Sequence, residues 1–148
     1  MITATFIQLF RRDLVKLISE IVAYKDEANI WVKGNDIANS AGNLALHIAG
    51  NFKHYIGFGL AQNNYVRNRP FEFEAAYIPR EILIKELNEA LLSVLKGLKT
   101  LNEEDLLNDY PCPIADKPKQ TAFTLCHMIT HLNYHLGQIN YHRKIYDK

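Results

Sequence analysis

Residues 121–146 read TAFTLCHMITHLNYHLGQINYHRKIY. Thr121 is a good capping residue, and the prolines shortly before it prevent an earlier helical start. Apolar residues then recur at the alternating spacing of three and four that places them on one helix face. These residues are Leu125, Ile129, Leu132, Leu136 and Ile139. The spacing predicts a helix from Thr121 to about Tyr146, with a substantial part of its surface buried.

Three further helices are expected before this one. The first covers about residues 3–24, where seven apolar residues share one face. The second follows a cap at Asn39 or Ser40 and runs to about Leu60. The third begins at Pro79, because a proline at the first helical position loses no hydrogen bond. Its stripe is the clearest in the chain: Leu83, Leu87, Ala90, Leu91, Val94 and Leu98.

The connections between these helices are long. Residues 25–39 are polar, with Trp31 as the one large apolar anchor, and residues 61–77 have no helical periodicity. A short helical turn is expected at residues 103–107. Because the sequence has neither a strand pattern nor an internal repeat, four helices with long connections predict an all-α, four-helix-bundle fold. We expect residues 1–148 to form a single domain.

Composition narrows the classes of function. The chain has 148 residues, 48% of them apolar, and a formal net charge of +1, so no strong field attracts nucleic acid or anionic lipid. No apolar run approaches the roughly 18 residues of a membrane span. Cys112 and Cys126 form neither a closely spaced metal motif nor a disulfide framework. We therefore expect a cytoplasmic protein that binds neither nucleic acid nor a membrane.

Histidines form a polar stripe on the last predicted helix. His127, His131, His135, Gln138 and His142 lie within an arc of roughly 80° at 100° per residue. Imidazoles four residues apart on a helix reach the same ion, and neutral imidazole is a preferred ligand of zinc, nickel, copper and ferrous iron. The alternative for each histidine is a hydrogen-bonded core or surface position.

A third ligand in a bundle usually comes from a different helix. His47 lies in the apolar run LALHIA, residues 44–49, so its position predicts burial and suggests ligation. The zinc-protease motif is incomplete, because Leu132 follows His131 where that motif has glutamate.

Three blocks of the sequence resemble the DinB-like superfamily. They are NSAGNLALHIAGN (39–51), RNRPFEF (67–73) and HLNYHLGQI (131–139), and the resemblance that they carry spans nearly the whole chain. The most specific element is the final His-x-x-x-His-x-Gly-Gln block. The superfamily includes YfiT-type metal-dependent hydrolases and bacillithiol- and mycothiol-dependent S-transferases.

The resemblance implies a four-helix bundle with one divalent transition metal, zinc or nickel, held by His47, His131 and His135. It also implies a homodimer. The ligand set rests on this resemblance, because periodicity alone does not favour His131 and His135 over His127.

The remaining histidines receive other interpretations. His54 shares the face of His47 but falls outside the matched blocks, and we expect it to meet solvent rather than line the same groove. His142 also falls outside the motif. His127 is expected to line a pocket or to orient a ligand, because a ligating imidazole needs a hydrogen-bond partner on its other nitrogen.

Other side chains near the motifs have structural and functional alternatives. Arg67 and Arg69 can bind a carboxylate, but we prefer a role in tying the long connection to acidic neighbours. Gly137 is expected to permit close helix packing, and Gln138 to orient a ligand. Cys112 lies between two prolines and is expected to be an exposed thiol without activation.

Three protein ligands leave at least one coordination position for water, thiolate or substrate. The position permits a hydrolase, or an S-transferase that presents a low-molecular-weight thiol to an electrophilic small-molecule substrate; the resemblance favours the transferase. A non-catalytic bundle that binds a metal or a small ligand is the alternative from another class. The sequence provides no recognisable general base, so the catalytic residues stay unassigned.

Overall fold

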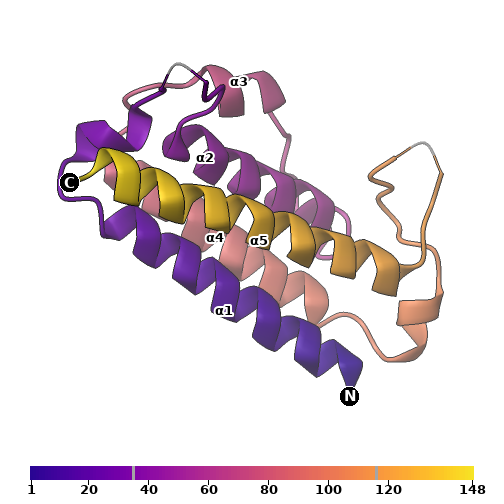
Figure 1. Cartoon of the computed structure of the whole chain (residues 1–148). Coiled ribbons are helices and arrows are strands. Elements are labelled where there is room, and N and C mark those ends of the chain that lie inside the picture. Colours follow the sequence, from indigo (N-terminus) through magenta and orange to yellow (C-terminus); the bar gives the residue numbers. More distant parts are fainter. Residues whose placement is uncertain (35, 116) are drawn as a thin grey trace.

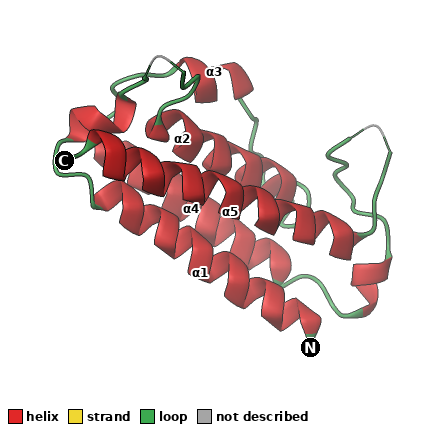
Figure 2. Cartoon of the chain, viewed as in Figure 1, coloured by secondary structure: helices red, strands yellow, loops and turns green. Residues whose placement is uncertain are grey.

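The computed structural model describes residues 1–34, 36–115 and 117–148, and the regular structure of these residues is helical apart from one isolated bridge between Asp109 and Gln120. Figures 1 and 2 show long helices lying side by side. The α-helices are α1 (Ile2–Val22), α2 (Ala41–Phe52), α3 (Arg69–Glu74), α4 (Arg80–Leu98) and α5 (Thr121–Tyr146). The shorter helical elements are η1 (Glu27–Trp31), η2 (Lys53–Phe58) and η3 (Glu104–Leu107).

Four of these helices form a bundle, which confirms the predicted fold class. α1 packs on α4 and α5, and α2 packs on the same two helices, so the four surround a common core (Figure 1). Within that core the rings of Phe10 and Phe52 pack edge to face, with their centroids 5.5 Å apart. The consequence for the site is that α2 and α5, which carry the candidate histidines, are direct neighbours.

Capping fixes the start of α2. Ser40 accepts a hydrogen bond from the backbone N–H of Asn43, and Asn43 Oδ1 accepts one from the Ser40 backbone, which together form a capping box. The Asn43 amide also donates to the backbone oxygens of Glu72 and Ala75, at 3.2 and 2.8 Å. The cap therefore ties the α3 segment to the start of α2. Of the two predicted caps, Ser40 is the one used.

The second predicted helix continues past α2 but changes its geometry. Residues Lys53–Phe58 form the π-helix η2, which packs against α4. Such widened turns within helices are rare and occur often at functional sites. The predicted end near Leu60 is thus right in position, although the last turns are not α-helical.

Three local expectations need correction. Pro79 is the N-cap of α4 rather than its first helical residue. Thr121 is the first residue of α5 rather than its cap; its hydroxyl donates to the backbone oxygen of Asn108 at 3.0 Å. The connection before α4 contains α3, which was not expected because six residues are too few for a visible periodicity. Asn68 caps this short helix by accepting from the backbone N–H of Phe71.

No helix in the described part of the chain is both long and apolar enough to cross a membrane.

Trp31 is buried, as expected of an anchor in the first connection, and its indole N–H donates to the backbone oxygen of Ile78 at 3.3 Å.

Two glycines on long helices have opposite surroundings. A Cβ at Gly97 on α4 would lie 2.7 Å from Ile56 Cγ2 and 2.9 Å from the Ile56 backbone oxygen, so this glycine permits the close approach of η2. A Cβ at Gly137 on α5 would meet nothing within 4 Å. The expectation that Gly137 serves close helix packing is therefore wrong.

We predict that Gly97→Ala lowers the free energy of unfolding by about 1–3 kcal/mol, because the added methyl group overpacks the α4–η2 contact. Gly137→Ala should raise it by about 0.5–1 kcal/mol, because alanine favours an exposed helix interior without a clash. Urea denaturation in the presence of a chelator measures both. Equal effects of the two substitutions would contradict this packing.

Candidate metal centre

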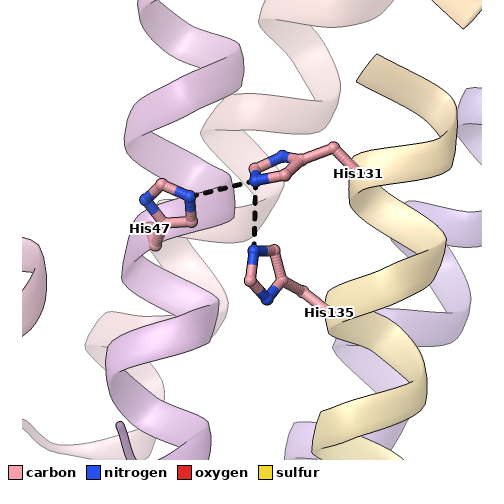
Figure 3. Close-up of side chains that lie close together, drawn as sticks. All are labelled: His47, His131 and His135. Carbon is pink, nitrogen blue, oxygen red and sulfur yellow. Dashed lines mark hydrogen bonds between the residues drawn. The ribbon is translucent and has the colours of Figure 1, made fainter. Parts of the chain in front are cut away.

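Three imidazoles from two helices converge in the bundle. His47 extends from α2, and His131 and His135 extend from successive turns of α5 toward it (Figure 3). His131 Nε2 lies 3.2 Å from His47 Nε2 and 3.1 Å from His135 Nε2. One ligand atom of each residue lies within 4.8 Å of those of the other two. Among the described residues, these three histidines form the candidate group for a metal ion, and they are called the triad.

Hydrogen bonds set the proton positions on two of the rings. His47 Nδ1 lies 3.0 Å from Glu72 Oε2, and an ionised carboxylate only accepts, so Nδ1 carries the proton. His135 Nδ1 donates to Gln138 Oε1 at 2.7 Å. In both rings the other nitrogen, Nε2, is therefore the one that faces His131 and the one that can offer a lone pair. Gln138 therefore makes the contact by which it was expected to orient a ligand.

The facing nitrogens fit a shared cation. A neutral His131 has at most one Nε2 proton, which can satisfy only one of the two lone pairs directed at it. Two nitrogens bound to one tetrahedral ion at about 2.0–2.1 Å lie about 3.3 Å apart. The observed separations of 3.1 and 3.2 Å are close to that value. The three nitrogens are thus placed so that they could hold a metal ion.

The surroundings keep His131 and His135 neutral. Burial, together with the charges that the neighbouring His135 and His47 would carry if protonated, lowers the pKa of His131 to about 4. Burial also lowers the pKa of His135, which outweighs the opposing hydrogen bond to Gln138. Because a metal binds the deprotonated imidazole, both rings are in the binding form at neutral pH.

Glu72 on α3 is the buried carboxylate that orients His47. Only 3% of it is exposed, and its two oxygens accept from Arg67 Nε at 2.7 Å and from Arg67 Nη2 at 2.9 Å. Burial by itself raises the pKa of Glu72, but the hydrogen bonds from His47 and Arg67 outweigh it and hold the pKa below its usual value. Gly50 on α2 leaves room for this carboxylate, because a Cβ there would overlap Glu72 Oε1.

Two hollows flank the histidines. A polar cleft of about 190 Å³ borders His47 and His131. Its polar lining consists of Asn51, Tyr55, Arg67, Arg69 and His127. A larger, mostly apolar cavity of about 500 Å³ borders His135. Its apolar lining includes Ile37, Leu44, Tyr134, Tyr141 and Ile145. The three histidines therefore lie between a polar and an apolar space.

The histidines outside the triad differ in their positions. His127 lines the polar cleft, as expected of a pocket residue, but the hydrogen-bond partners that orient His47 and His135 are Glu72 and Gln138. His54 is half-buried rather than solvated, with its ring stacked on Phe58 at 5.7 Å.

His142 is buried and lies outside the triad. Its Nδ1 accepts from the Tyr24 hydroxyl at 2.7 Å, and its Nε2–H donates to the backbone oxygen of Val32 at 2.8 Å. Both ring nitrogens are thus used in structural hydrogen bonds.

The two arginines and Cys112 agree only in part with the expectations from the sequence. Arg67 pairs with an acidic neighbour, Glu72, whereas Arg69 forms no ion pair with any described residue. Cys112 is half-buried rather than exposed, and burial raises the pKa of its thiol, which agrees with the absence of activation. Sequence reasoning missed Glu72, although it lies in the matched block RNRPFEF. The signal that could have identified it is an acid near two arginines in a block shared with the ligand motifs.

A family model described as "Protein of unknown function (DUF1572)" matches residues 3–148. This family is part of the DinB/YfiT-like group that the three sequence blocks resemble. A search of curated proteins gives no match. The homodimer that the resemblance implies stays a prediction.

We predict that His47→Ala, His131→Ala and His135→Ala each weaken metal binding by more than about 100-fold, since losing a ligand should cost more than losing its hydrogen-bond partner. His54→Ala and His142→Ala should retain the metal, although the latter should destabilise the fold. Elemental analysis of untagged variants after dialysis measures the occupancy. Full retention in either His131→Ala or His135→Ala would contradict the assignment.

We also predict that Glu72→Gln weakens zinc binding by about 10–100-fold, because the amide cannot hold the His47 tautomer as firmly and leaves the Arg67 charge unpaired. Gly50→Ala should have a similar effect by displacing the carboxylate. Competition with a chelator of known affinity measures the change. Glu74→Gln, an exposed position on the same short helix, is the matched control, and wild-type affinity in Glu72→Gln would refute the orienting role.

Proposed function

The chain belongs to the DUF1572 family, and we propose that it is a metal-dependent S-transferase that joins a low-molecular-weight thiol to an electrophilic small molecule. The observation that carries this proposal is the placement of the three-histidine cluster between a polar cleft and an apolar cavity. Imidazole suits zinc, nickel, copper and iron, and of these we propose zinc or nickel.

His47, His131 and His135 would hold the metal through Nε2 and leave at least one coordination position open. When bound, such a metal supplies a Lewis acid that lowers the pKa of a thiol and favours its nucleophilic thiolate form. Glu72 and Gln138 contribute by fixing the orientation of two of the rings, so the site is organised before substrate arrives.

The two hollows support a reaction with two substrates. The polar cleft suits a hydrophilic thiol, and the apolar cavity beside His135 suits a hydrophobic electrophile. In the proposed reaction the S–H proton passes to His127 or to water, a C–S bond forms, and the leaving group departs with its bonding electrons. His127 is suited to accept the proton because it lines the cleft, with its ring 6.4 Å from that of His131.

The lack of a free acidic side chain among the described residues of the polar cleft favours the transferase over the hydrolase. In zinc proteases of the HExxH type, a glutamate beside the metal is the general base that activates the attacking water. None of the described residues that line the polar cleft is acidic, and both Glu72 oxygens are occupied by His47 and Arg67. A thiol needs less help from a base, because its pKa is far lower than that of water.

We predict that low-molecular-weight thiols perturb the absorption spectrum of the cobalt-substituted protein, because sulfur ligation gives charge-transfer bands that nitrogen and oxygen ligands lack. The bands should strengthen as the pH rises toward the pKa of the thiol, since binding releases a proton. The same protein should accelerate conjugation of the thiol to an aromatic chloride electrophile.

His54→Gln is the matched control for this experiment and should behave like the wild type, whereas His135→Ala should show neither the bands nor the acceleration. If a panel of thiols leaves the spectrum of the protein unchanged while the metal is verified in the site, the transferase is excluded.

A further inference from the structure

Arg69 lies beside the triad and has no acidic partner among the described residues. It is exposed, lines the polar cleft, and forms no ion pair among the described residues. Its guanidinium lies 5.8 Å from the centre of the Phe73 ring, and that ring lies 5.0 Å from the ring of His47. The contact with Phe73 holds the positive charge near the candidate metal ligands.

Arg67 has a different role in the same cleft. Its Nε and Nη2 both donate to Glu72, so its charge is balanced by a buried carboxylate. Its guanidinium lies 5.8 Å from the centre of the Tyr55 ring, which also lines the cleft. None of the described residues that line the cleft is acidic, so among them the charge of Arg69 has no counter-charge.

We propose that Arg69 binds a carboxylate of the thiol substrate, so that the polar cleft selects a monoanionic thiol acid; this inference rests on the proposed function. A guanidinium matches a carboxylate with two parallel hydrogen bonds. A single guanidinium with no counter-charge among the described residues matches one negative charge better than the two of a phosphate monoester. Asn51 and Tyr55 provide further polar groups in the cleft for the bound acid.

The first test compares 3-mercaptopropionate with its methyl ester, which differ at the carboxylate and not at the thiol. The probes are titrated into cobalt-substituted protein and followed by the sulfur charge-transfer absorption. The acid should bind about tenfold more tightly than the ester, as expected for hydrogen bonds to a charged group. Arg69→Gln should abolish this preference and leave the affinity for the ester unchanged, whereas Arg11→Gln, an exposed substitution on α1, should retain it.

The second test removes the thiol from the probe. Propionate titrated into the zinc-loaded, ¹⁵N-labelled protein should shift the Nε–H resonance of Arg69 in a saturable way, and propionamide should not. If neither thiol changes the cobalt spectrum but propionate shifts Arg69, the carboxylate subsite stands and the transferase fails. Equal binding of acid and ester, a preference that survives in Arg69→Gln, or no shift with propionate would overturn the subsite.

Discussion

The hydrogen bond from His47 Nδ1 to Glu72 Oε2 is the interaction on which the site depends. It places the proton on the outer nitrogen of the ring and leaves the inner nitrogen free to face α5. A buried carboxylate without partners would cost several kcal/mol, but here Arg67 balances its charge with two hydrogen bonds. The same carboxylate therefore satisfies a buried cation and orients a candidate ligand.

This interaction gives the long connection before α4 a functional role. The connection contains α3, which supplies Glu72. Arg69 is the first residue of this helix, and Arg67 lies two residues before it. Asn43 attaches α3 to the start of α2 through two backbone oxygens, and Gly50 provides space for the carboxylate one turn beyond His47. The segment that covers the site is thus fixed to the same helix that carries His47.

The sequence predicts the long helices well because their apolar stripes repeat over several turns. It also indicates His47, His131 and His135 as candidate metal ligands, although the resemblance was needed to prefer His131 and His135 over His127. Their convergence at Nε2 depends on α2 and α5 being neighbours, which periodicity does not determine.

Short-range and tertiary features were harder to predict. α3 is too short to show a period, and the π-helical geometry of η2 depends on its packing against α4. The environments of His54, His142 and Gly137 likewise depend on which helix face meets a neighbour. Glu72 was missed for the same reason, because its burial becomes visible only when α3 folds over α2.

The central claim is that one divalent metal is held by three imidazoles that neighbouring helices bring together. X-ray absorption at the metal edge, on protein expressed without a polyhistidine tag, tests this claim most directly. The account predicts about one zinc or nickel per chain, with three imidazole nitrogens at about 2.0–2.1 Å if the metal is zinc. A protein that binds no metal, or a metal spectrum without imidazole scattering, would contradict it.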